Sequence, residues 1–374
     1  MREIELYLHI PFCIRKCAYC DFLSGPADET VRRAYVEALL REIRAMGRCT
    51  EAEVATVFVG GGTPSVLPAD WMEEIMGQLR DSFRLLPEAE ISMEANPGTV
   101  TLEKLDAYRR GGINRISFGC QSADNEELRL LGRIHSWEDF LESFSLAREA
   151  GFSNINVDLM SGLPGQTAAS WEQTLRRTAA LRPEHISAYS LIIEEGTPFA
   201  RQKLSLPDEE EERTMYERTG EILKEYGMEQ YEISNYARPG RACRHNIGYW
   251  TGREYLGLGL GSASLMEGER FSNTSVMEEY LADSGRPGKL RRDRQKLSEK
   301  DRIEEFMFLG LRMTEGIREK EFQDTFGRRI HTVYGPVIRK YVEGGFLAEE
   351  KGRLYLTRKG ISVSNPILAD FLLD

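Results

Sequence analysis

The clearest chemistry in this sequence lies near its N-terminus, where Cys13, Cys17 and Cys20 fall within eight residues with the spacing C-x3-C-x2-C. Thiolates are preferred ligands of iron–sulfur clusters and zinc, and a tight group of cysteines outside a disulfide framework indicates a metal site. Three thiolates can each bind one iron of a 4Fe-4S cluster, which ordinarily has four cysteine ligands. The fourth iron then keeps an open position for ligand chemistry.

A zinc ion held by these cysteines and His9 is the alternative interpretation. His9 falls within a predicted strand, four residues before the first cysteine, so the sheet rather than the cysteine loop directs its side chain. The pattern therefore favours the iron–sulfur cluster, with His9 as a core or hydrogen-bonded residue. Among the scattered cysteines, we expect Cys49 and Cys120 to be small buried side chains.

Glycines and polar residues also follow several predicted strands. They are the run Gly60-Gly61-Gly62-Thr63-Pro64 and the single residues Glu94, Gln121 and Asp158. In parallel α/β barrels the active site lies at the carboxyl edge of the strands, and successive glycines let backbone groups approach a ligand closely. The glycine run lacks the spacing of a dinucleotide or phosphate loop, and alone it fits a tight turn equally well. Together these positions predict a site at one mouth of the sheet, shared with the cysteine loop.

The elements that must position these residues follow from an alternation of apolar runs and amphipathic segments. The predicted strands are residues 4–10, 54–59, 90–94, 113–118, 154–159 and 185–193, and the predicted helices are residues 30–46, 69–83, 102–110, 137–150 and 170–181. Repeated β–α units predict parallel strands with right-handed crossovers. Because the alternation ends near residue 200, we expect an α/β fold with a partial barrel of six units.

The remainder of the chain has a different character. The acidic residues 208–212 are typical of a first helical turn, and a further strand is expected at residues 230–234. The basic segment 286–296 has the composition of a linker or long loop. From residue 297 the pattern is three helices and a hairpin, which resembles a winged-helix domain. We therefore divide the chain into a barrel (1–235), a connecting segment (236–296) and a C-terminal helical, winged-helix-like domain (297–374).

The phrase Tyr7-Leu-His-Ile-Pro-Phe-Cys13, with Tyr19 directly before the third cysteine, resembles the radical S-adenosylmethionine (SAM) superfamily, and within it the proteins similar to oxygen-independent coproporphyrinogen III oxidase. The resemblance implies that the open iron binds the amino and carboxylate groups of S-adenosylmethionine, and that the reduced cluster cleaves it to a 5′-deoxyadenosyl radical. It implies that Gly62 and Thr63 line the methionine part and that Glu94 holds its amino group. The other positions that match contacts to this cofactor are Tyr7, Tyr19, Gln121, Arg133, Asp158 and, at the adenine, Ile192. Arg133 has a plain physical role, because a guanidinium pairs with a carboxylate through two parallel hydrogen bonds.

One departure narrows the resemblance. The oxidases of this family have a further cysteine two residues after the third, where this sequence has Phe22. A sister branch, the heme chaperones, shares this departure and the motif His-Asn-x-x-Tyr-Trp, which is residues 245–250 here. The resemblance implies that the protein binds heme through this motif and delivers it to an acceptor protein, such as one of the respiratory chain. His245 is the candidate axial ligand, Cys243 is a second candidate ligand, and flanking aromatics can pack on a porphyrin.

The alternative function is that of the oxidase, which converts two propionates of coproporphyrinogen III to vinyl groups without oxygen. The three cysteines and the glycine run fit both functions, so whether the protein is an enzyme stays open at this point.

Composition excludes other classes. Of 374 residues, 41% are apolar and 29% charged, as in globular proteins. The net charge of −11, from 49 basic and 60 acidic residues, opposes broad binding of nucleic acid. No apolar run reaches the roughly 18 residues of a membrane helix, and the N-terminus lacks the basic region of a signal peptide. We therefore expect a cytoplasmic protein without a nucleic-acid partner or transmembrane segment, for which peripheral contact with a membrane stays open.

Overall fold

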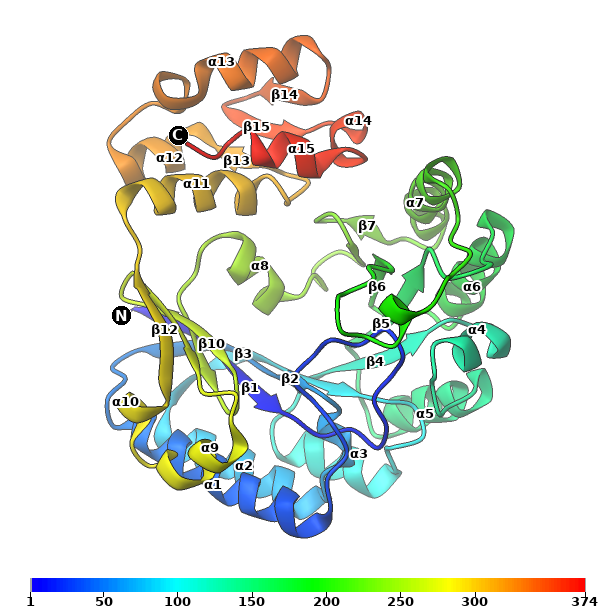
Figure 1. Cartoon of the computed structure of the whole chain (residues 1–374), viewed down its shortest axis with the longest axis vertical. Helices are drawn as coiled ribbons and strands as arrows, with labels where there is room; N and C mark the ends of the chain where they lie inside the picture. Colours follow the sequence, from blue (N-terminus) through cyan, green and yellow to red (C-terminus); the bar gives the residue numbers. More distant parts are fainter. Residues whose placement is uncertain (1, 374) are drawn as a thin grey trace.

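Twelve strands form one curved sheet in the computed structural model, which describes residues 2–373 (Figure 1). Their order is β12-β11-β10-β9-β1-β2-β3-β4-β5-β6-β8-β7. The six strands from β1 to β6 pair in parallel: β1 (Glu3–Ile10), β2 (Glu53–Gly61), β3 (Arg84–Ala95), β4 (Arg115–Gln121), β5 (Ile155–Ser161) and β6 (His185–Ser190).

The crossovers between these strands carry helices that cover the outer face of the sheet (Figure 1). They are α1 (Glu29–Gly47), η1 (Pro64–Val66), α2 (Ala69–Ser82), α3 (Leu102–Arg110), α4 (Asn125–Leu130), α5 (Trp137–Glu149) and α6 (Ala168–Ala180). Side chains cap the first turns: Asp28 accepts from the Val31 amide, and Ser136 and Thr167 form capping boxes. The predicted α/β partial barrel of six units is thereby confirmed. The largest difference at a strand end is at β3, which begins six residues earlier than predicted because Arg84 and Leu85 pair with the start of β2.

The sheet ends at one edge with two short antiparallel strands. After η2 (Phe199–Arg201) and α7 (Glu209–Glu225), the chain forms β7 (Glu229–Gln230) and β8 (Asn235–Ala237). The acidic start of α7 has the expected helical role, with Asp208 as its cap. The single strand expected at residues 230–234 is wrong, because the buried Glu232 carboxylate accepts from the Ser234 amide at 2.8 Å and so closes a turn there.

The connecting segment extends the same sheet at its other edge. It contains α8 (Arg244–Trp250), β9 (Tyr255–Leu258), β10 (Ala263–Met266), β11 (Glu269–Asn273), α9 (Met277–Asp283), α10 (Pro287–Leu290) and β12 (Arg291–Lys296). Strand β9 pairs in parallel with β1. The expected linker at 286–296 is wrong, since it forms α10 and the edge strand β12. An edge strand tolerates charge, and here Arg292 pairs with Glu279 at 2.6 Å and Arg294 with Glu269 at 2.9 Å.

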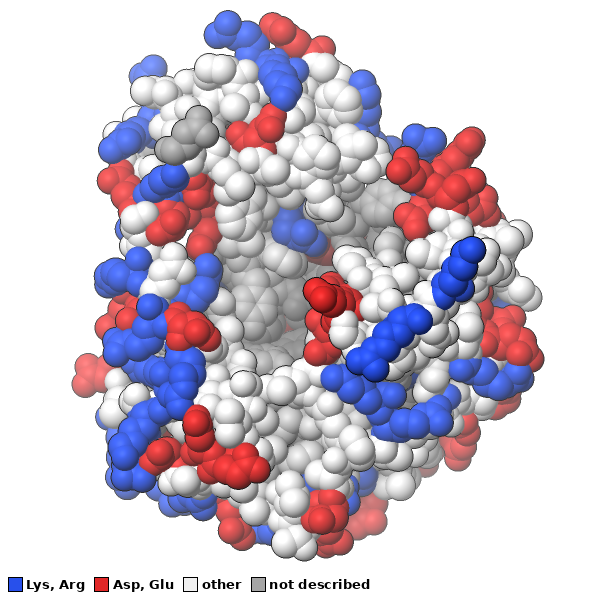
Figure 2. All heavy atoms as spheres, viewed as in Figure 1, with Lys and Arg blue, Asp and Glu red and all other residues white. Residues whose placement is uncertain are grey.

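The C-terminal unit has a hydrophobic core of its own, which includes Phe322, Tyr334 and Leu354. Its elements are α11 (Glu299–Gly310), β13 (Ile317–Arg318), α12 (Glu319–Phe326), α13 (Ile330–Glu343), β14 (Leu347–Glu350), β15 (Arg353–Leu356), α14 (Arg358–Ile361) and α15 (Ser364–Ala369). The predicted order of three helices and a hairpin is therefore confirmed. Helix α8 lies between this unit and the sheet (Figure 1), and Figure 2 shows a hollow on the same face of the molecule, below the unit. Among residues 2–373, no helix has the length and apolarity required to cross a membrane.

Candidate cluster and S-adenosylmethionine site

The cysteine loop follows β1 and is held against the glycine run at the end of β2. The Gly62 amide donates to the Ile10 carbonyl at 2.8 Å, and the Thr63 amide donates to the Phe12 carbonyl at 2.7 Å. A Cβ atom on Gly62 would lie 2.6 Å from the Phe12 carbonyl oxygen, so no other residue fits there. The glycine run therefore fixes the position of the cysteine loop.

The three cysteines of the loop line one cavity of about 120 Å³ and all are free thiols. Among the described residues, these three sulfurs do not all lie within 4.8 Å of one another. Thiolates that share one zinc ion at about 2.3 Å each must approach one another more closely than this, whereas each thiolate of a cluster binds a different iron. His9 lies apart from them, with its Nε2 on the Leu23 carbonyl at 2.8 Å and its Nδ1 on the Tyr7 hydroxyl at 3.0 Å. The arrangement fits a cluster and not the zinc alternative.

The wall beside Cys17 carries a buried guanidinium. Arg133 donates to the Asn96 side-chain oxygen at 2.8 Å, to the Gly119 carbonyl at 2.5 Å and to the Cys17 sulfur at 3.5 Å. Its Nε has no hydrogen-bond partner among the described residues. Asn96 also donates to Thr63 at 2.8 Å. This wall therefore offers a fixed cation with an unused donor, which suits a carboxylate ligand.

Two buried carboxyl groups complete the mouth of the barrel. Burial and the neighbouring Asp158 raise the pKa of Glu94 to about 8, and its carboxylate accepts from the Gly61 amide at 3.1 Å. Burial also raises the pKa of Asp158, which accepts hydrogen bonds from Ser117 and Asn156. Among the described residues, no basic side chain forms an ion pair with Glu94. An unpaired buried carboxyl fits the amino group of a ligand.

Most predicted cofactor contacts are brought together here. Those that line the cavity with the cysteines are Tyr19, Gly62, Thr63, Glu94, Gln121, Arg133 and Asp158. Gln121 stands at a bulge with a φ of 71°, a conformation that functional sites often retain. Tyr7 lines an adjoining cavity of about 220 Å³, which shares Glu94 and Asp158 with the first. Ile192 lies beyond β6, is 70% exposed and lines neither cavity, so its contact with adenine stays a prediction.

His245 is almost fully buried on α8, and both of its ring nitrogens are hydrogen-bonded. Its Nδ1 lies 2.7 Å from the Thr56 hydroxyl, its Nε2 lies 3.1 Å from the Tyr249 hydroxyl, and its ring stacks on Phe58. Burial lowers its pKa to about 3, so the ring is neutral. Ligation of iron would require Tyr249 or Thr56 to release a nitrogen.

The other scattered cysteines differ from one another. The thiol of Cys243 is fully buried and contacts Glu90 at 3.4 Å, and burial raises its pKa to about 12. Cys120 is buried, as predicted. The prediction for Cys49 is wrong, because this residue is exposed in the turn that follows α1.

Sequence reasoning missed Asn96 and Arg115. Asn96 bridges Thr63 and Arg133, and Arg115 is a fully buried cation in the second cavity, beside Asp158. Asn96 directly follows β3, so its place at a strand end could have identified it, whereas Arg115 is the first residue of β4 and no such signal marks it.

A parallel partial barrel with a three-cysteine loop at its mouth defines a radical S-adenosylmethionine protein. Accordingly, residues 7–178 match the Radical SAM superfamily and residues 297–363 match the HemN C-terminal domain. The heme chaperone HemW of Bacillus subtilis is 36% identical over 98% of both chains, and that of Escherichia coli is 35% identical over 99% of this chain and 98% of its own. The solved coproporphyrinogen III oxidase (HemN) of Escherichia coli superposes with a TM-score of 0.87 at 25% identity, over 99% of this chain and 90% of the other. The chain belongs to the HemW family of heme chaperones.

Proposed function

We propose that this protein binds heme and delivers it to an acceptor protein in the cytoplasm, and that it holds a 4Fe-4S cluster with S-adenosylmethionine at the mouth of its barrel. The observation that carries the proposal is the similarity to curated heme chaperones along essentially the whole of both chains. An acceptor in the respiratory chain, reached by peripheral contact with a membrane, is part of the proposal.

Different residues at the barrel mouth would hold the cluster and the S-adenosylmethionine. Cys13, Cys17 and Cys20 would hold the cluster, and the reduced cluster would supply the electron that cleaves the sulfonium of the bound cofactor. Arg133 would orient the ligand's carboxylate and Glu94 its amino group. Tyr7, Tyr19, Gly62, Thr63, Gln121, Asp158 and Ile192 complete the proposed contacts.

The alternative, a coproporphyrinogen III oxidase, draws on the structural similarity to the Escherichia coli enzyme. Position 22 argues against it. Phe22, where the oxidases have a further cysteine, lines the cluster cavity and is 62% exposed. A phenyl ring supplies neither a thiolate nor a proton donor at this place.

One paired assay separates the two functions. The full chain is reconstituted anaerobically with iron, sulfide and S-adenosylmethionine, then titrated with heme and, separately, incubated with coproporphyrinogen III. We expect stoichiometric heme uptake, seen as a shift of the Soret band, and no protoporphyrinogen. Formation of protoporphyrinogen, or failure to take up heme, would overturn the proposal.

A pair of histidine variants tests whether His245 is an axial heme ligand. His245→Ala is compared with His135→Ala, which removes a similarly buried histidine outside the motif. If His245 is an iron ligand, only the first variant changes the position of the Soret band. Equal spectra in both variants would exclude ligation by His245.

A further inference from the structure

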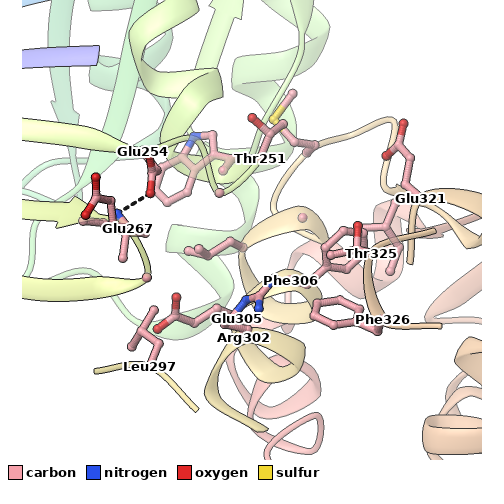
Figure 3. Close-up of a pocket in the computed structure, with 18 of the residues that line it drawn as sticks. Thr251, Glu254, Glu267, Leu297, Arg302, Glu305, Phe306, Glu321, Thr325 and Phe326 are labelled. Atoms are coloured by element: carbon pink, nitrogen blue, oxygen red, sulfur yellow. Dashed lines mark hydrogen bonds between the residues drawn. The ribbon is translucent and has the colours of Figure 1, made fainter. Parts of the chain in front are cut away.

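A cavity lies between the C-terminal unit and the edge of the sheet, apart from the cluster site. Its volume is about 560 Å³, within the range of small-molecule sites, which favour such boundaries between units. One wall comes from the end of α8 and from β10, and the other from α11 and α12. Figure 3 shows Arg302, Phe306 and Phe326 close together on the C-terminal side, with Leu297 nearby.

The charges around this cavity are unbalanced. Its four carboxylates are all engaged in ion pairs: Glu254 and Glu267 with Arg2, Glu305 with Arg270, and Glu321 with Arg318. The two basic residues that line it, Lys296 and Arg302, form no ion pair with any described carboxylate, and the Lys296 ammonium donates to the Glu267 carbonyl at 2.9 Å. The cavity therefore offers two cations without a carboxylate partner beside aromatic and aliphatic walls, which suits a large apolar ligand with acidic substituents.

The cavity also receives the last residue of the motif at 245–250. Trp250 ends α8 and lines the cavity. Its indole Nε1 is buried without a hydrogen-bond partner among the described residues, and the Arg312 guanidinium lies 4.3 Å from the centre of its ring. At the other end of the helix, His245 lines the polar cavity of the barrel with both nitrogens occupied. The motif thus supplies an aromatic wall to one cavity without supplying a free iron ligand to it.

We propose that this cavity is the heme site, and that it recognises the macrocycle rather than the iron. The porphyrin face packs against Trp250 and Phe306, and its two propionates pair with Lys296 and Arg302. The inference rests on the proposed function, because the heme chemistry comes from the family, whereas the place and the mode of recognition come from the cavity.

Metal-free protoporphyrin IX tests the mode of recognition. It has the same propionates and ring as heme but no iron, so the full chain should bind it with an affinity within about threefold of that for heme. Binding of heme with no measurable binding of the metal-free ring would show that an iron ligand is the anchor and would overturn the inference.

Two variants test the place. Lys296→Glu with Arg302→Glu reverses the charge of the two cations, and Leu309→Trp fills the cavity with a larger side chain; each should weaken heme binding at least tenfold. The control, Arg329→Glu with Arg339→Glu, makes the same change of charge at exposed positions of the same unit, neither of which lines the cavity. Circular dichroism and thermal melts identify any variant that is misfolded.

The outcomes separate the two proposals. A wild-type chain that binds no heme contradicts the proposed function itself. A wild-type chain that binds heme, with folded cavity variants that bind it as tightly as the control, leaves the proposed function intact and places the heme elsewhere.

Discussion

Glu5 is a buried carboxyl whose removal has a predictable effect on stability. It lies in the middle of β1 with no exposed surface, and neither of its oxygens has a hydrogen-bond partner among the described residues. The nearest charged group is Arg253, at 3.9 Å, and the neutral ring of His245 lies at 3.7 Å. Burial outweighs the Arg253 charge and raises the pKa of Glu5 to about 8. We therefore expect Glu5→Gln to stabilise the protein at neutral and alkaline pH.

The sign follows from proton linkage. Between the unfolded pKa of about 4.5 and the folded pKa of about 8, the folded state binds a proton that the unfolded state does not, so stability falls as pH rises through this window. At about 1.4 kcal/mol per pKa unit, the loss relative to a neutral side chain is about 3 kcal/mol at pH 7 and levels off near 5 kcal/mol above pH 8. Glutamine has nearly the same shape and does not titrate, so it avoids this loss.

The assay is denaturant unfolding of the full chain between about pH 5 and pH 9. The matched control is Glu3→Gln, because Glu3 lies two residues earlier on the same strand, 3.8 Å from the same Arg253, but is about half exposed. The free-energy difference between Glu5→Gln and wild type should widen by several kcal/mol as pH rises, while the control changes by less than about 1 kcal/mol. A difference that stays constant across this range would refute the reasoning about Glu5.

Two further predictions concern the cluster and S-adenosylmethionine site, and a third concerns the packing of α8 on β1. Cys17→Ala should abolish the iron and sulfide content and the brown absorbance after reconstitution while circular dichroism stays unchanged; retained iron and sulfide would refute the ligand assignment. S-adenosylmethionine affinity should rise by up to about 20-fold from pH 6 to pH 8, because Glu94 ionises while the ligand's own amino group loses about half of its protons; Glu94→Gln should bind more weakly, and a wild-type profile as flat as that of the variant would exclude the pairing. Gly248→Ala should destabilise the fold by about 1–3 kcal/mol in denaturant unfolding, because the added methyl group overlaps the Glu5 carboxylate. Gly335→Ala, with open space around its Cα, is the control and should be neutral or stabilising.

Periodicity predicted most of the barrel strands well because they are largely apolar and alternate with amphipathic helices. It failed where the pattern carries little information about pairing. The charged segment of β12 has no apolar face, and only its place at the edge of the sheet, beside β11, makes it a strand. The strand expected at 230–234 does not form, because the buried Glu232 carboxylate accepts a hydrogen bond from the Ser234 amide and closes a turn there. Residue propensities do not predict this hydrogen bond.

The cofactor site likewise has residues that the sequence predicts and contacts that only the tertiary fold reveals. The cysteines and the strand-end residues were predictable, because parallel strands bring their carboxyl ends to one edge. The partnership of Arg133 with Asn96 was not, since 37 residues separate them and only the tertiary fold places their side chains 2.8 Å apart. The occupied nitrogens of His245 were equally hidden, because Thr56 approaches the ring from a different part of the chain.

The motif at 245–250 therefore has several physical roles on one seven-residue helix. Its histidine ties α8 to β2 through Thr56, and its tyrosine holds the other ring nitrogen of that histidine. The glycine at 248 gives β1 room to approach, since any side chain there would overlap Glu5. Its tryptophan reaches the cavity at the C-terminal unit. Because residues of this helix line a cavity at each of its ends, any coupling that it carried between the proposed cofactor and heme sites would have to be reciprocal.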